Sequence, residues 1–269
     1  MSNKFRKIMR GLVYCILWVV LICSLLYLLN DLYYRNKEQS AIEEIRLEKQ
    51  KAIENAETDT KDTKSAAIAS DTEDEQILKG YKSLHEEDND LYGWITIEDT
   101  DIDFPVMFTP HDPNFYENRT QEKETIDSGG WWIWIDGHAT KDTENVIIYG
   151  HKMKGGKMFG SLNKYYKDQG FYEEHKYIQF DTLYERGTYE IISVVKTKDY
   201  GEDESHYQFY DHMELDSEEE FQEYVDNAKE NAWFPIETTA EYGDRLITLS
   251  TCDYWTDEGR LLIIAKKIR

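Results

Sequence analysis

One segment near the N-terminus constrains the architecture of this chain more than any other. Residues 11–30, GLVYCILWVVLICSLLYLLN, contain no charged side chain, and about 20 apolar residues in a helix are enough to cross the hydrocarbon core of a bilayer. The ten residues before them, MSNKFRKIMR, carry four basic side chains and no acidic one. A basic flank of this kind stays on the cytoplasmic side. We therefore expect a cytoplasmic tail at 1–10, a single membrane anchor at 11–30 and an extracytoplasmic remainder.

A cleaved signal peptide is the alternative interpretation of the same segment. Such a signal has a shorter apolar region, followed by a cleavage site of the small-x-small type. Here the apolar run continues into DLYYRNK, which contains no such site. The two tyrosines of this stretch also suit a membrane interface. We therefore interpret the segment as an uncleaved anchor.

The chain as a whole is strongly acidic. With 31 Lys and Arg against 54 Asp and Glu, its net charge is −23. A nucleic-acid partner is excluded, because phosphate contacts require clustered Lys and Arg. The sequence has no Gly-rich phosphate loop and no CxxC or HExxH spacing, so we expect no metal ion and no organic cofactor. The acidic run GEDES at 201–205 could hold Ca²⁺, but we interpret it as a solvated charged loop.

Composition divides the part after the anchor into a stalk and a folded domain. Residues 31–72 are rich in Glu, Lys, Asp, Thr, Ala and Ser. The part up to about Glu57 is compatible with a helix, and TDTKDTKSAAIASDTED is predicted to be a flexible linker because it cannot bury a core. The folded domain is expected at 73–269. It begins with a helix whose apolar side chains share one face: Ile77, Leu78, Tyr81 and Leu84.

Short strands dominate the rest of this domain. Runs rich in β-branched and aromatic residues, bounded by turn residues, predict strands: LYGWITI, DIDFPVMF, ENVIIYGH, DRLITLSTC, GRLLIIAKK and a hairpin in KYIQFDTLYERGTYEIISVVKTKD. KMFGSLNKYYKDQGFYEEH is predicted to be partly helical, and Ser217 and Glu220 form a capping box ahead of the helix FQEYVDNAKENAW. This pattern favours a closed or nearly closed β-barrel with helical insertions. A β-sandwich is compatible with it as well.

Three polar residues stand at the ends of predicted strands, where a rigid scaffold can hold catalytic groups. Cys252 is the only cysteine outside the anchor and follows ITLST, His151 follows NVIIYG, and Arg260 opens LLIIAKK. An unpaired cysteine in an exported protein indicates a reactive thiol. A histidine can support its ionisation and protonate a leaving amine. An arginine can stabilise an oxyanion.

Each of these residues also has a structural interpretation. A cysteine after an apolar run is often a buried core residue. His138, in DGHAT, is an alternative to His151 as the functional histidine. Arg260 would neutralise the acidic surface around Asp257 and Glu258 if it had no role in a site.

The motifs around these residues resemble those of sortases. TLSTC at 248–252, with an arginine at the start of the last strand, resembles the TLxTC signature of that family, and YGH at 149–151 is similar to the segment with its catalytic histidine. LYGWITIEDTDIDFPV matches the strands that open the family's fold. HKMKGGKMFGSLNKYYKDQGFYEEHKYIQFDT resembles class B specifically, and the helix at 217–233 fits a helix that class B inserts. The resemblance covers about 75–269.

This resemblance implies a sortase-like closed β-barrel and a membrane-anchored cysteine transpeptidase. Cys252 would attack the Thr carbonyl of a C-terminal sorting signal on a surface protein and form a thioester, and an amine of a peptidoglycan precursor or a pilin lysine would resolve it. His151 would be the general acid and base, and Arg260 the oxyanion and substrate clamp. Substrate contacts are expected from three residues: Ser250, Thr251 and Tyr207.

Two other functions are compatible with the same residues. A cysteine peptidase would use the same groups and let water resolve the thioester, and a non-enzymatic surface binding module would carry an inert Cys252. One stretch departs from the family pattern, because GGWWIWID at 129–136 is unusually aromatic. We interpret these rings as core, and a surface that meets the substrate is the alternative.

Overall fold

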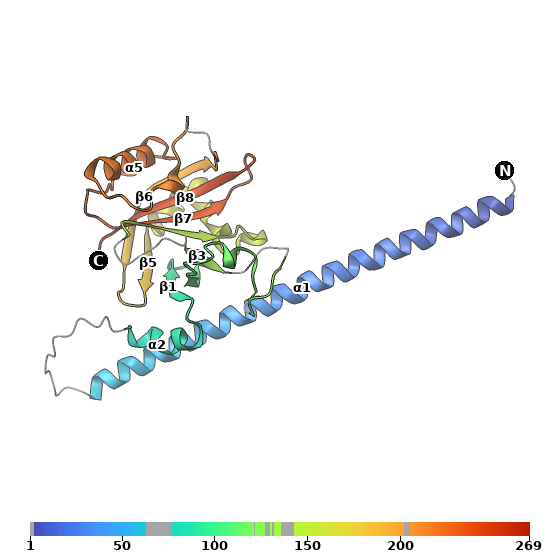
Figure 1. Ribbon diagram of the computed structural model, residues 1–269, viewed down its shortest axis with the longest axis horizontal. Coiled ribbons are helices and arrows are strands. Elements are labelled where there is room, and N and C mark those ends of the chain that lie inside the picture. Colours follow the sequence, from blue (N-terminus) through green and yellow to red (C-terminus); the bar gives the residue numbers. More distant parts are fainter. Residues whose placement is uncertain are drawn as a thin grey trace. The chain divides into compact units, whose positions relative to one another are not determined.

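The computed structural model describes residues 3–62, 77–120, 122–126, 130, 132–135, 143–201 and 205–269. They fall into two compact units, Met1–Ala41 and Ile42–Arg269, which are described separately (Figure 1). Some of the predictions concern residues outside the described ranges. These are His138, the linker from residue 63 onward, the centre of the acidic run at 201–205 and three positions of the aromatic stretch at 129–136.

The first unit is the N-terminal part of the long helix α1 (Asn3–Asp62). Between Met9 and Glu54 the helix contains an 18-residue window with a mean hydropathy of 2.7, which is long and apolar enough to cross a membrane by length and composition. Its large apolar side chains, from Leu12 to Leu29, are exposed.

The second unit is built on a closed barrel of eight strands in the described part of the chain. The strand order around the barrel is β1-β2-β3-β4-β7-β8-β6-β5. The strands are β1 (Leu91–Thr96), β2 (Asp103–Met107), β3 (Ile133–Ile135), β4 (Asn145–Gly150), β5 (Tyr177–Thr182), β6 (Thr188–Lys198), β7 (Leu246–Cys252) and β8 (Gly259–Lys267). The predicted barrel is confirmed, and the sandwich alternative is excluded, because every strand has two paired neighbours.

Two of the strand pairings are parallel and join distant parts of the sequence. β2 pairs with β3, and β4 pairs with β7, whereas the other neighbours are antiparallel. Since parallel neighbours need a long crossover, the chain between β4 and β7 has room for helices and for the hairpin β5–β6. The end of β4 thereby lies beside the end of β7.

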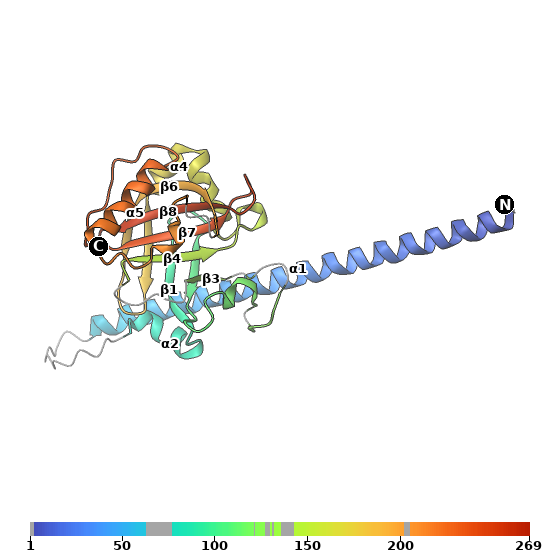
Figure 2. The same cartoon turned by 45° about the horizontal axis from the view of Figure 1, so that its top comes forward.

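The helix α5 (Glu218–Glu230) covers one side of the barrel beside β6 and β8 (Figure 2). Its predicted capping box is present, since the Ser217 hydroxyl accepts a hydrogen bond from the Glu220 backbone and the Glu220 carboxylate accepts one from the Ser217 backbone. One face of α5 is fully buried against the outside of the sheet: Phe221, Tyr224, Val225 and Ala228. Strands β7 and β8 are therefore covered on both faces, which explains their continuous apolar sequences.

The remaining helices are short. Within the described ranges they are α2 (Lys79–Glu87), α3 (Lys164–Lys167), α4 (Gln169–Glu174) and four 3₁₀ turns, η1 (Phe115–Asn118), η2 (Lys154–Gly156), η3 (Phe159–Asn163) and η4 (Phe209–Asp211). The helical character predicted for KMFGSLNKYYKDQGFYEEH is confirmed by η3, α3 and α4. Tyr81 and Leu84 of α2 are buried, as the apolar face of that segment predicts.

The compact unit begins earlier than the sequence predicted. We expected a stalk at 31–72 and a domain from residue 73, but the part of α1 that starts at Ile42 packs on the barrel. Ile42 is 4% exposed and belongs to the barrel's core cluster. Further along α1, Ile53 approaches α2 so closely that a Cβ at Gly80 would lie 2.9 Å from its Cγ1.

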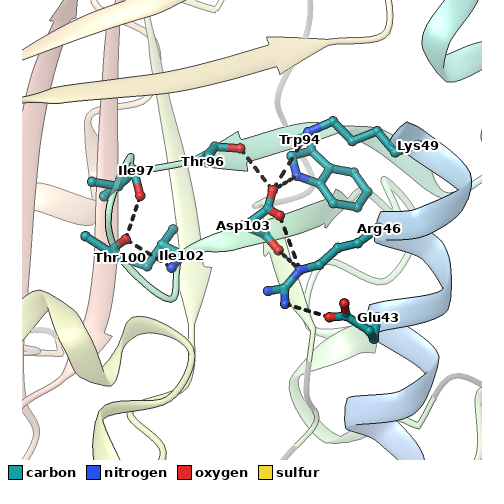
Figure 3. A network of polar contacts seen from close by, with 9 residues as sticks. All are labelled: Glu43, Arg46, Lys49, Trp94, Thr96, Ile97, Thr100, Ile102 and Asp103. Carbon is teal, nitrogen blue, oxygen red and sulfur yellow. Dashed lines mark hydrogen bonds and ion pairs between the residues drawn. The ribbon is translucent and has the colours of Figure 1, made fainter. Parts of the chain in front are cut away.

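A polar network fixes this part of α1 to β1 and β2 (Figure 3). The Asp103 carboxylate accepts hydrogen bonds from Trp94 Nε1 at 2.6 Å and Thr96 Oγ1 at 3.1 Å. Arg46 of α1 donates from Nε to the Asp103 carbonyl at 2.6 Å, and the Lys49 ammonium lies 4.2 Å from the centre of the Trp94 ring. We call Arg46, Lys49, Trp94, Thr96 and Asp103 the docking face.

Candidate active site

The ends of three neighbouring strands bring the candidate residues together. In the parallel pair β4–β7 the last registered partners are Tyr149 and Ser250, and His151 and Cys252 each follow two positions later. In the antiparallel pair β7–β8, Cys252 lies directly opposite Arg260. Thiol, imidazole and guanidinium therefore share one end of the barrel. We call these three residues the catalytic rim.

The catalytic rim opens into a pocket of about 430 Å³. It contains all three rim residues and also Ser250 and Thr251, so five of the six predicted site residues line it. The other lining residues are Asn114, Glu117, Trp134, Tyr149, Gly150, Asp199, Gly201, Gln208, Tyr210 and Asp211. Cys252 is a free, partly exposed cysteine.

Tyr207 is the predicted substrate contact that does not line this pocket. Its ring stacks on His212, with centroids 4.6 Å apart, and packs beside Tyr224 of α5. Burial raises the pKa of its hydroxyl. Tyr210, three positions later, lines the pocket and shares a hydrogen bond of 3.1 Å with Ser250. The 3₁₀ turn η4 begins between the two residues, so the chain brings Tyr210 and not Tyr207 to the pocket.

His151 is held by a backbone group that the sequence did not indicate. Its Nε2 lies 2.6 Å from the carbonyl oxygen of Glu117 in η1. Since a carbonyl only accepts hydrogen bonds, Nε2 carries a proton, and Nδ1 is the nitrogen that can exchange one. The ring also packs against Trp134, with centroids 5.4 Å apart. This contact and the hydrogen bond fix the orientation of the imidazole.

Arg260 is partly buried and surrounded by acidic groups. Its guanidinium lies 3.4 Å from Glu258 and 3.9 Å from Asp199, and its side chain is 22% exposed. Burial opposes its charge, but Cys252, Tyr210 and the two carboxylates together outweigh that effect and raise the pKa of Arg260. The guanidinium is therefore a permanent cation beside the thiol, where it can stabilise negative charge on sulfur or on a substrate oxygen.

A larger cavity of about 670 Å³ lies at the opposite end of the barrel. It is lined by Val146 and Leu246, where β4 and β7 begin, and by aromatic side chains such as Tyr92 and Phe180. It contains no cysteine and is therefore not a candidate for thiol chemistry.

Comparison with known proteins identifies the family of the chain. The family model described as "Sortase domain" matches residues 95–268, which include most of the barrel and all three rim residues. The chain belongs to the sortase family.

The proteins that this sortase resembles are class B sortases, and it belongs to the same class. It is 30% identical to Sortase B of Listeria monocytogenes over 87% of each chain, and 29% identical to Sortase B of Staphylococcus aureus over 72% of this chain and 77% of that one. A crystal structure of sortase B from Bacillus anthracis in complex with AAEK2 matches at 31% identity, with a TM-score of 0.63, over 76% of this chain and 89% of that one. The structure of a Staphylococcus aureus sortase B–substrate complex has the same fold, with a TM-score of 0.70 at 24% identity over 87% of this chain and 97% of that one. This sortase is therefore a cysteine transpeptidase.

The described residues of the aromatic stretch of this sortase are buried, and one of them also lines the pocket. Ile133 and Ile135 are buried inside the barrel, and Trp132 packs on Tyr116 with ring centroids 5.7 Å apart. Trp134 is also buried but reaches the pocket, where it stacks on Tyr149 at 5.8 Å. Tyr149 in turn stacks on Tyr210 at 6.1 Å. One wall of the pocket is therefore a row of aromatic rings that ends at His151.

Among the described residues of the sortase, no three His, Cys, Asp or Glu side chains lie close enough to hold a metal ion. The polar groups of the pocket are instead suited to covalent chemistry. The thiol supplies a nucleophile, the imidazole exchanges protons, and the guanidinium offers donors to an oxyanion.

Proposed function

We propose that this sortase cleaves a C-terminal sorting signal through a thioester on Cys252 and transfers the shortened protein to an amine. The observation that carries the proposal is the meeting of Cys252, His151 and Arg260 at the ends of β4, β7 and β8. The Cys252 thiolate attacks the carbonyl carbon of the substrate's Thr, and the Arg260 guanidinium stabilises the oxyanion that forms. His151, as imidazolium, protonates the departing amine.

The second half of the reaction reverses these roles. An acceptor amine attacks the carbonyl carbon of the thioester, and His151 removes a proton from that amine. The Cys252 thiolate then leaves, and a new amide bond joins the substrate to the acceptor. An acyl intermediate of this kind must favour amines over water. The aromatic wall formed by Trp134, Tyr149 and Tyr210 supports this preference, because its stacked rings place apolar surface in the pocket and the Tyr210 hydroxyl is hydrogen-bonded to Ser250.

The substrates belong to surface proteins that carry a sorting signal, and the acceptor is an amine of a peptidoglycan precursor or a pilin lysine. Structures of sortase B proteins with a substrate and with a triglycine peptide support both halves of this proposal. For direct substrate contacts we retain Ser250 and Thr251, and we place Tyr210 in the role first given to Tyr207, since Tyr210 lines the pocket. The hydroxyl of Thr251 is buried and has no hydrogen-bond partner among the described residues.

The sortase works at the outer face of the membrane in this proposal. Residues 11–30 form the single anchor, the basic tail lies in the cytoplasm, and the barrel is extracytoplasmic. The apolar composition of α1 and the four basic residues before it support this topology.

The product of the reaction distinguishes the transpeptidase from a peptidase. We expect the full-length protein in detergent to cleave peptides of the pattern N-P-x-T-x or x-P-x-T-G, and an added amine such as triglycine to convert the product from acid to amide. Mass spectrometry separates the two products. An acid product at every amine concentration would establish a peptidase that uses water. A protein that cleaves no such peptide and whose Cys252 resists alkylation would be a binding module.

A further inference from the structure

The residues that follow His151 and Cys252 meet behind the pocket. His151 and Cys252 both line the pocket, whereas Lys152 and Asp253 do not. Instead, the Lys152 ammonium lies 3.4 Å from Oδ1 of Asp253. Successive side chains of an extended segment point to opposite sides. The residue after His151 and the residue after Cys252 therefore form an ion pair on the side away from the pocket.

This ion pair is largely shielded from water. The side chain of Asp253 is 4% exposed and that of Lys152 is 17% exposed. On its other side the carboxylate faces Lys196 of β6, whose ammonium is 3.8 Å from Oδ2 and is itself 13% exposed. The carboxylate also acts on Tyr166, whose pKa is raised to about 12 by burial and by this neighbouring charge.

Both lysines are held in place by aromatic rings. The Lys196 ammonium lies between 4.3 and 5.5 Å from the centres of three rings, those of Tyr166, Trp233 and Trp255. The Lys152 ammonium lies 5.0 Å from the ring of Tyr254. The loop that carries Asp253 is tight, since Asp253 donates its backbone hydrogen bond to Gly259 at 2.8 Å and a Cβ at Gly259 would lie 2.1 Å from the Asp253 carbonyl oxygen.

We propose that Lys152 and Asp253 are positioning residues, whose buried ion pair sets the separation of His151 from Cys252. The proposal rests on the thioester chemistry proposed above. The β4–β7 ladder ends at the pair Tyr149 and Ser250, before the two catalytic residues, so its hydrogen bonds do not fix their side-chain separation. A buried ion pair adds little net stability, but it allows only one arrangement of the segments it joins. Reacting groups displaced by about 1 Å can lose about 10²-fold in rate.

Two lysine variants separate positioning from stability, because both lysines face the same carboxylate. Lys152→Met and Lys196→Met each remove one cation from Asp253, but Lys196 lies on β6, which contributes no residue to the pocket. We expect kcat for sorting-signal peptide to fall at least about tenfold in Lys152→Met and less than about threefold in Lys196→Met. The KM for the peptide should stay within about twofold in both, since neither side chain lines the pocket. Lys152→Arg, which keeps the charge, should recover most of kcat.

Asp253→Asn removes the same ion pair from the side of the carboxylate. It keeps the shape of the side chain and removes its charge, and we expect a loss of kcat like that of Lys152→Met. The double variant Lys152→Met/Asp253→Asn should be no slower than the slower single variant, because both substitutions remove one interaction. Thermal unfolding of every variant measures the loss of stability separately.

The experiment uses full-length protein in detergent and has a readout that needs no substrate. Iodoacetamide alkylation of Cys252 is followed by mass spectrometry of its peptide, because Cys15 and Cys23 are also free. We expect slower alkylation in Lys152→Met than in Lys196→Met. If the wild-type protein cleaves no sorting-signal peptide, the proposed function fails, while alkylation still tests the ion pair. Equal alkylation and equal kcat in the two lysine variants, or losses of kcat that merely follow the fall in Tm, would overturn the positioning role.

Discussion

The catalytic rim and the docking face use similar residues for different purposes. Each has an arginine near a carboxylate, and in each another side chain packs on a tryptophan ring, Lys49 on Trp94 and His151 on Trp134. At the docking face the polar groups satisfy one another: Asp103 accepts from Trp94, Thr96 and Arg46 in one closed network. At the catalytic rim the groups face an open pocket, and the thiol of Cys252 has no covalent partner.

The difference shows that charge and burial alone do not mark a site. Lys49 has the pKa most strongly lowered among the described lysines, to about 8, because burial opposes its charge, yet it serves to dock a helix. What distinguishes the catalytic rim is that its polar groups line an open pocket around one nucleophile. We therefore expect substitutions at the catalytic rim to change chemistry without unfolding the protein, and changes at the docking face to do the reverse.

The largest effect should come from Cys252→Ala. Loss of the nucleophile should lower peptide cleavage by at least about 10³-fold, while the free energy of unfolding should change by less than about 1 kcal/mol, since little buried area is lost. Cleavage assays and denaturant unfolding on the same preparation give both numbers. Residual cleavage near the wild-type rate would remove Cys252 from the mechanism.

Arg260→Lys should follow, with a loss of about 10²-fold in kcat/KM. The ammonium keeps the charge but not the planar set of donors that can bind an oxyanion. Arg245→Lys is the matched control, because Arg245 lies at the other end of β7 in an ion pair with Glu185 at 2.7 Å. Equal rates in the two variants would reduce Arg260 to a surface charge.

Truncation of α1 tests whether the docking face stabilises the barrel. Removing residues 1–41 should leave a stable and active protein, because the compact unit begins at Ile42. Removing residues 1–72 also deletes the docked part of α1 and exposes Trp94 and Asp103, so we expect a loss of about 3 kcal/mol in the free energy of unfolding. Differential scanning calorimetry of the two proteins makes the comparison. Equal Tm values would show that the helix adds nothing to the barrel.

The smallest effect is a pH dependence at the docking face. The pKa of Lys49 is lowered from 10.5 to about 8 by burial, against the pull of Asp103 and Asp181. Between these values the unfolded chain binds more protons than the folded one, so stability should rise with pH from about 8 towards 10. We expect a gain of about 1 kcal/mol relative to Lys49→Met, after allowance for its partial exposure.

The readout is the difference between the two proteins, because other groups titrate as well. Tyrosines with a raised pKa, such as Tyr81 and Tyr116, lower stability only above about pH 10. Urea unfolding at about pH 7.5 and about pH 9.5, on either side of the folded-state titration, therefore isolates Lys49. Parallel stability curves for wild type and Lys49→Met would contradict the assignment.

The sequence predicted the catalytic rim better than it predicted the docking face. The strands β7 and β8 are neighbours in the chain, so the meeting of Cys252 and Arg260 followed from a single turn. The β4–β7 pairing joins segments far apart in the sequence and could not follow from local patterns; the motif resemblance supplied it. Groups that act through the backbone, such as the Glu117 carbonyl on His151, leave no trace in side-chain identity.

The docked part of α1 was missed because its apolar signal is diluted. Ile42, Ile45 and Ile53 are separated by charged residues. The tightest contacts come from Arg46 and Lys49, and residues of these types are exposed to solvent in most proteins. The partner groups lie far along the chain, on β1 and β2. A charged helix face can be recognised as an interface only when the opposing face is known.

The order of strands around the barrel has a consequence for the newborn chain. Arg260 lies on β8, which pairs with both β6 and β7, and Cys252 gains its neighbours only after β4 and β7 have met. Contacts of such long range form late in folding. In a chain emerging from the ribosome, Cys252 is therefore present before its neighbours His151 and Arg260 have come beside it. The three residues come together only when the last two strands close the barrel.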